Sequence, residues 1–99
     1  MFKVRIGPAA EKDLEDGVRF YELQEQGFGR VFYDCLLADL GALRIFAGLH
    51  VKPLEGFHRT LSKRFPFAIY YDLVDDTATI AAIVHCRRDP KAIQKRLKR

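Results

Sequence analysis

The spacing of apolar residues changes near position 57, and this change limits the fold more than any other feature. Between residues 10 and 47, apolar side chains recur every three or four residues, whereas after position 57 they mostly alternate with polar ones. All seven glycines lie at or before position 56. The first period predicts amphipathic helices and the second predicts β-strands. Because 99 residues suit one core, we expect a single α+β domain over residues 1–99.

One strand and two helices are expected in the first half. The alternating residues 2–6 predict a strand, and Gly7-Pro8 ends it and opens a helix. One face of this helix carries Ala10, Leu14, Val18 and Tyr21. A second helix carries a similar stripe, formed by Phe32, Cys35, Leu36, Leu40, Leu43 and Ala47. Since only the Gly-Phe-Gly turn at residues 27–29 separates the two helices, we predict an antiparallel hairpin that ends its first helix at these glycines.

Three antiparallel strands are expected in the second half, over residues 58–65, 67–74 and 77–86. Leu61 and Phe65 should face inward, and Pro66 requires the first ladder to bend or restart. The third strand is almost continuously apolar, which is typical of a strand covered on both faces. Asp89-Pro90 then opens a short basic helix. The predicted order is therefore β-α-α-β-β-β plus this helix, with the hairpin laid on a three-stranded antiparallel sheet.

Several classes of protein are excluded by the sequence. No apolar run is long enough to cross a bilayer or to form a signal peptide, so we expect a cytoplasmic protein without a membrane partner. The two cysteines form neither a disulfide framework nor a four-ligand zinc site, and the three histidines lack metal-ligand spacing. No nucleotide-binding glycine motif or nucleophile elbow occurs. We therefore expect neither a metal nor another cofactor.

Positive charge is concentrated in the second half of the chain. Residues 1–50 have a net charge of −2, whereas residues 51–99 have +6, which gives the total of +4. A basic half suggests a polyanionic partner, either nucleic acid or an acidic protein segment. The alternative is a solvated basic tail that keeps a small protein soluble.

A cluster of cations and an aromatic residue on the predicted sheet forms the candidate site. Its members are Arg59, Lys63, Arg64, Tyr70, Arg87 and Arg88. Antiparallel pairing of the three strands should bring them to one end or face of the sheet. Arginines contact phosphates and aromatic rings stack on bases, so the cluster could bind a target or an acidic partner. The alternative is a set of edge charges that protects the sheet against aggregation.

Three apolar residues lie off the main helical stripes, namely Phe20, Leu23 and Phe46. They either complete the core between the hairpin and the sheet or form an exposed groove that another chain covers.

The order of elements and two sequence runs resemble the RelE/ParE superfamily of toxins from type II toxin–antitoxin modules, which are often labelled plasmid-stabilisation proteins. The runs are Leu-Ser-Lys-Arg-Phe-Pro-Phe-Ala-Ile-Tyr-Tyr at 61–71 and Val-His-Cys-Arg-Arg-Asp-Pro at 84–90. Residues 8–16, together with Phe20-Tyr21, are similar to the first helix of that family. The resemblance covers nearly the whole chain and is closer to the ParE branch.

Two mechanisms are implied by this resemblance. ParE-like members inhibit DNA gyrase by binding, without catalytic residues, whereas RelE-like members cut ribosome-bound mRNA with basic residues and often a Tyr or His near the C-terminus. No Tyr or His follows Cys86 here, which favours the gyrase inhibitor over the endoribonuclease. If the chain is a nuclease, the implied catalytic residues are Arg64, Arg87 and Tyr70.

The resemblance also implies a cognate antitoxin as partner. In the family, the C-terminal segment of the antitoxin wraps the hairpin and the sheet, which would place acidic residues near Arg59, Arg64 and Arg88. Without the antitoxin, an exposed groove could form a homo-oligomer. A third alternative is a non-toxic member that only binds its antitoxin or contributes to repression of its operon.

Overall fold

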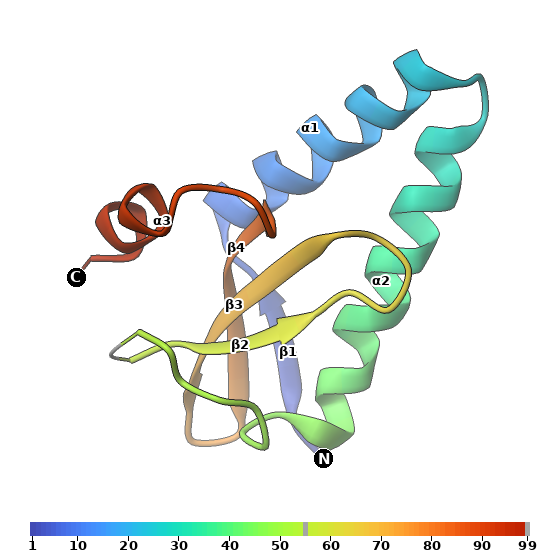
Figure 1. Ribbon diagram of the computed structural model, residues 1–99. Coiled ribbons are helices and arrows are strands. Elements are labelled where there is room, and N and C mark those ends of the chain that lie inside the picture. Colours follow the sequence, from blue (N-terminus) through green and yellow to red (C-terminus); the bar gives the residue numbers. More distant parts are fainter. Residues whose placement is uncertain (55, 99) are drawn as a thin grey trace.

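The computed structural model describes residues 1–54 and 56–98. In chain order, the elements are β1 (Lys3–Ile6), α1 (Pro8–Gln24), α2 (Phe28–Phe46), β2 (His58–Leu61), β3 (Phe67–Val74), β4 (Thr77–His85) and α3 (Pro90–Leu97) (Figure 1). The predicted α+β class and the predicted order of elements are both confirmed.

The described strands form a four-stranded sheet in the order β1-β4-β3-β2. β2, β3 and β4 pair antiparallel, as predicted, whereas β1 pairs in parallel with β4 through the register Lys3↔Thr77 to Ile6↔Ile80. The sequence predicted a three-stranded antiparallel sheet and did not assign a neighbour to the first strand, which the structure places beside β4. Parallel neighbours need a long connection, and the helical hairpin and the two strands after it supply this connection.

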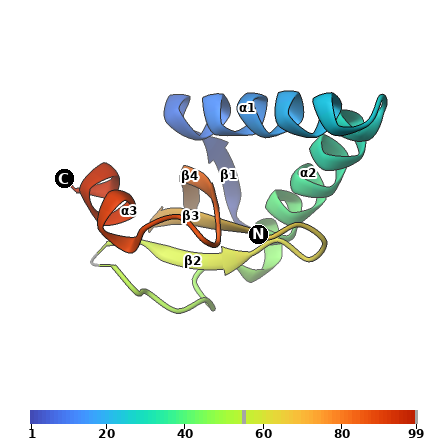
Figure 2. The same ribbon diagram turned by 45° about the horizontal axis from the view of Figure 1, so that its top comes forward.

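The helical hairpin covers one face of the sheet (Figures 1 and 2). Its predicted stripes are confirmed as the core, although Cys35 is only half-buried. The two helices approach closely at two glycines. A Cβ on Gly17 would lie 2.5 Å from the Phe32 ring, and one on Gly29 would lie 2.7 Å from the Val18 carbonyl oxygen. The first helix ends at Gln24, before the glycines at which the sequence predicted its end. Gly29 lies in the first turn of α2, and Gly27, with φ of 88°, forms the left-handed turn between the helices.

The shorter helix α3 covers the opposite face of the sheet (Figure 2). Ile93 and Leu97 of α3 form a second buried cluster with sheet residues that include Tyr70. The pairing of β3 with β4 skips Ala81. This bulge reverses, from that point on, which β4 residues face the hairpin and which face α3. The prediction that the last strand is covered on both faces is confirmed, since Ile80 lies in the hairpin core and Ala82 under α3.

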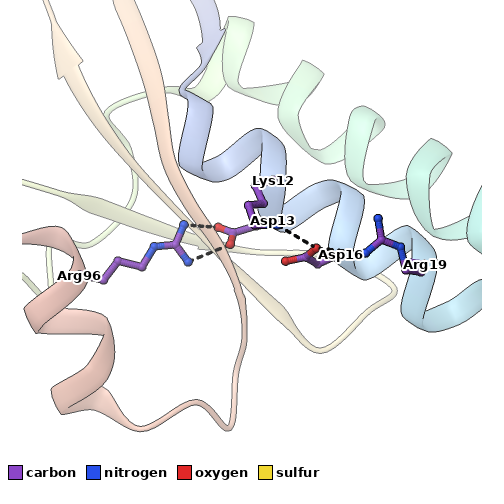
Figure 3. Close-up of polar contacts among 5 residues, drawn as sticks. All are labelled: Lys12, Asp13, Asp16, Arg19 and Arg96. Carbon is purple, nitrogen blue, oxygen red and sulfur yellow. Dashed lines mark hydrogen bonds and ion pairs between the residues drawn. The ribbon is translucent and has the colours of Figure 1, made fainter.

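An ion pair fixes the position of α3. The guanidinium of Arg96 donates from Nη1 and Nη2 to the two carboxylate oxygens of Asp13 in α1, at 2.8 and 2.5 Å (Figure 3). Asp13 Oδ2 also accepts the backbone N–H of Ile83 at 2.9 Å. Because β1 ends opposite Ile80, none of the described strands pairs with Ile83 on that side, and Asp13 accepts its N–H instead. Asp13 thus connects α1, β4 and α3.

β2 is shorter than predicted. It ends at Leu61, which is 57% exposed rather than inward, whereas Phe65 packs against the hairpin core as expected. The hydroxyl of Ser62 donates to Asp39 Oδ2 of α2 at 2.5 Å, and the Ser62 N–H donates to the Phe67 carbonyl. These bonds turn the chain out of the strand before Pro66. Residues 62–66, including Lys63 and Arg64, therefore form a loop instead of extending the strand.

Candidate functional site

Four of the predicted cations lie at one end of the sheet, and we call them the basic end: Lys63, Arg64, Arg87 and Arg88. The end of β2 pairs with the start of β3, and the start of β3 pairs with the end of β4, so loop 62–66 and the turn after β4 are neighbours. The Cys86 N–H donates to the Pro66 carbonyl at 2.8 Å and joins the two segments directly. All four side chains are exposed, and none forms an ion pair with another described residue. The predicted convergence of these cations is therefore present.

Arg59 and Tyr70 lie outside the basic end. They are opposite each other in the β2–β3 ladder, and the Arg59 N–H donates to the Val51 carbonyl at 2.9 Å. Tyr70 is only 5% exposed, because it belongs to the cluster beneath α3. Its ring is thus not available for stacking on a base while α3 is in place, and its catalytic role stays a prediction.

His85 lies beside the basic end, opposite Phe67, although its sequence pattern did not place it among the candidate site residues. Its Nδ1 accepts the Arg87 backbone N–H at 3.0 Å, and its ring lies 5.5 Å from the Phe67 ring. Because Nδ1 is an acceptor, the neutral ring carries its proton on Nε2. The signal in the sequence was its position directly before the Cys-Arg-Arg run.

An apolar groove of about 630 Å³ runs along the hairpin between α1 and α2. The apolar residues that line it are Ile6, Leu14, Val18, Leu23, Tyr33 and Leu37. Of the three residues predicted to lie off the helical stripes, Leu23 lines this groove, whereas Phe20 and Phe46 are exposed outside it. The charged lining is mostly acidic, with Glu11, Glu15 and Glu22 against Arg19. We call this surface the hairpin groove.

The carboxylate of Glu22 also shapes the hairpin. It accepts the backbone N–H groups of Gly27 and Gly29 at 3.0 to 3.1 Å. Since α2 has no side-chain cap of its own, Glu22 satisfies donors that the first turn leaves unpaired. One side chain of α1 therefore both fixes the turn and lines the hairpin groove.

A third polar cluster surrounds the hydroxyl of Tyr71, in the middle of β3. This oxygen accepts the Gly48 N–H at 2.9 Å and lies 2.6 Å from Nδ1 of His50. The His58 ring stacks on Tyr71, and its Nδ1 lies 2.9 Å from the His50 carbonyl oxygen. Burial, aided by the nearby His58, lowers the pKa of His50, and burial raises the pKa of Tyr71. The cluster holds the loop after α2 against the sheet.

Residues 1–54 and 56–98 contain no group of three or more His, Cys, Asp or Glu side chains arranged to hold a metal ion. None of the helices in this part of the chain is both long and apolar enough to cross a membrane.

Comparison with known proteins identifies the fold. No protein-family model matches the chain, and no curated protein is significantly similar to it. Among solved structures, a chain of the chromosomal ParDE TA system from P. aeruginosa superposes with a TM-score of 0.78. The match covers 86% of this chain and 96% of that chain, with 15% sequence identity. At this identity the likeness establishes the fold alone, and the protein described here shares the fold of that chain.

Proposed function

We propose that the protein is the toxin of a type II toxin–antitoxin module and that it inhibits DNA gyrase in the manner of ParE-like toxins. The observation that carries this proposal is the superposition with a chain of a ParDE system, which extends over 96% of that chain. The exposed basic end and the open hairpin groove support it, because both are surfaces suited to binding another macromolecule.

The hairpin groove is the proposed docking site for the core of the antitoxin. A groove between two helices, lined by apolar side chains spaced along one helical face, accommodates an amphipathic helix. Its acidic lining favours a helix with basic residues beside the apolar ones. An acidic extension of the same antitoxin would then lie against the arginines, chiefly Arg64 and Arg88, with Arg59 further along the sheet.

The arrangement around the basic end favours binding over RNA cleavage. Cleavage by the 2′-hydroxyl needs a group that takes its proton and a group that protonates the leaving oxygen. Tyr70 is covered by α3, and Nδ1 of His85 is occupied by the Arg87 N–H. The exposed charged groups there are arginines and a lysine, which bind phosphates or carboxylates well but are poor bases at neutral pH.

Induction of the protein alone in bacteria, followed by pulse-labelling of new DNA and new protein, tests the proposal. We expect DNA synthesis to fall first and the purified protein to inhibit supercoiling by gyrase. An R64A/R88A variant should lose this effect. R44A should keep it, because Arg44 is exposed and lies at the opposite end of the sheet, where its backbone carbonyl accepts the Phe2 N–H. If protein synthesis falls first and ribosome-bound mRNA is cut, the protein is a RelE-like endoribonuclease. If neither falls, the protein is a non-toxic member that binds its antitoxin or contributes to operon repression.

A further inference from the structure

A second open groove, of about 1070 Å³, lies between α3, the end of β3 and the loop before β2. Its floor is aliphatic and includes Leu54, Leu73, Val74 and Leu97. Four lysines line it, namely Lys52, Lys91, Lys95 and Lys98. We call this surface the lysine groove. It adjoins α3, which covers the face of the sheet away from the helical hairpin, so it is separate from the hairpin groove (Figure 2).

The orientation of α3 explains why three of these lysines converge. Lys91, Lys95 and Lys98 follow one another at spacings of four and three residues, which places them on one side of the helix. Ile93 is buried against the sheet, and Arg96 is bound to Asp13, so the helix cannot rotate about its axis without breaking these contacts. The remaining lysine, Lys52, comes from the loop before β2.

The positive charge of the lysine groove is not balanced by its described lining. None of the four lysines forms an ion pair with another described residue. The described residues that line the groove include four lysines and no carboxylate. Like charges around an apolar hollow create a positive potential that attracts an anionic ligand. A ligand that also covers the aliphatic floor gains from burial as well as from charge.

We propose that the lysine groove binds an acidic peptide segment in which apolar side chains alternate with carboxylates. The floor favours a peptide over nucleic acid, because non-specific binding of single strands relies on exposed aromatic rings. The aromatic residues here are covered, since Phe57 is 6% exposed and Tyr70 lies under α3. A peptide of the proposed pattern directs its carboxylates to the lysines and its apolar side chains to the floor.

Binding of labelled peptides to the purified full chain tests this proposal without reference to toxicity. The probe is a fluorescein-labelled peptide in which Leu alternates with Glu and Asp, followed by fluorescence anisotropy at low and at physiological salt. An all-Glu peptide of the same length and a uridine oligonucleotide serve as comparison ligands. We expect the alternating peptide to bind most tightly, and its affinity to fall with salt.

Two variants locate the site. K91E/K95E should weaken binding of the alternating peptide by about tenfold, because each lost surface ion pair contributes a factor of a few. K3E/K12E makes the same change of net charge on β1 and α1 and should leave the affinity within about twofold. V74S should weaken binding of the alternating peptide but not of the all-Glu peptide, because Val74 belongs to the aliphatic floor. All of these side chains are exposed, and unchanged thermal melting would confirm that the variants fold.

Three results would overturn the proposal. The first is equal weakening by K91E/K95E and K3E/K12E, which would mean that only net charge matters. The second is that the oligonucleotide binds more tightly than the alternating peptide and loses this affinity in K91E/K95E, which would make the lysine groove a nucleic-acid interface. The third is no binding of the alternating peptide at low salt.

Discussion

Asp13 and Arg96 are 83 residues apart in the sequence, and their side chains form a two-pronged ion pair that joins α1 to α3. Both side chains are largely shielded, with 14% of Asp13 and 24% of Arg96 exposed. By contrast, the other acid–base contacts on α1, Lys12 and Arg19 with Asp16, are longer and lie in solvent (Figure 3). The first pair therefore determines where α3 lies, whereas the others contribute little.

Replacing Asp13 by Ala should destabilise the fold. The substitution leaves the Arg96 guanidinium partly buried without its partner and removes the acceptor of the Ile83 N–H, so we expect a loss of about 2 kcal/mol in the free energy of unfolding. Urea denaturation measures this loss. The matched control is Lys12→Ala, which removes an exposed contact of 3.7 Å and should cost less than about 0.5 kcal/mol. Equal losses in the two variants would contradict the assigned role of Asp13.

Replacing Gly17 by Ala should destabilise the hairpin although alanine favours helices. The added methyl group would meet the Phe32 ring at 2.5 Å, and overpacking of this kind costs about 1 to 3 kcal/mol. Gly41→Ala is the matched control in α2, because a Cβ there meets nothing within 4 Å. That variant should be stabilised by about 0.5 to 1 kcal/mol. Thermal unfolding of both variants checks the two signs, and stabilisation of G17A would disprove the close approach of the helices.

Stability should decrease at mildly acidic pH because of His50. Burial beside the Tyr71 hydroxyl lowers the pKa of His50 below its usual 6.5. The unfolded chain therefore takes up the proton first as the pH falls, so the stabilisation is complete above pH 6.5 and is lost as the pH drops through the folded pKa. We expect the unfolding free energy to fall as the pH is lowered below 6.5, and to fall less in a His50→Asn variant. The same slope in both proteins would assign the effect to other groups.

A charge placed in the hairpin groove should block the proposed antitoxin. Leu37 lines the hairpin groove and is 38% exposed, so Leu37→Asp would bury a carboxylate under the docked helix. We expect a loss of affinity of about thirtyfold or more, which is the size of a central interface contact. Isothermal titration calorimetry with the proposed antitoxin gives the value. Ile45→Asp is the control on the same helix, since Ile45 is 63% exposed and lies outside the hairpin groove. A similar loss in both variants would place the antitoxin elsewhere.

The helices were predictable from the sequence because their signals are local. Apolar residues at helical spacing define the buried face of α1 and α2, and Pro8 and Asp89-Pro90 mark helix starts. The convergence of the basic end was also predictable, because antiparallel pairing of consecutive strands follows from short connections.

Other features depend on contacts between distant segments, and local patterns do not contain them. The length of β2 is limited by Asp39 of α2, which accepts a hydrogen bond from the Ser62 hydroxyl although the two residues are far apart in the sequence. Tyr70 is buried because α3 packs over its face of the sheet. The alternation of residues within β3 does not show that this face is covered. The lysine groove likewise brings Lys52 close to a helix that begins at Pro90, and local sequence patterns do not reveal contacts between segments so far apart in the chain.

The two buried clusters on opposite sides of the sheet should open at different free energies. The cluster beneath α3 is the smaller one, and a helix of eight residues does not persist in water without a surface to pack on. Loss of α3 would uncover one face of β3 and β4 while the hairpin still protects the other. Amide hydrogen exchange would then show two thresholds, with α3 exchanging by local opening and the central strands only by global unfolding.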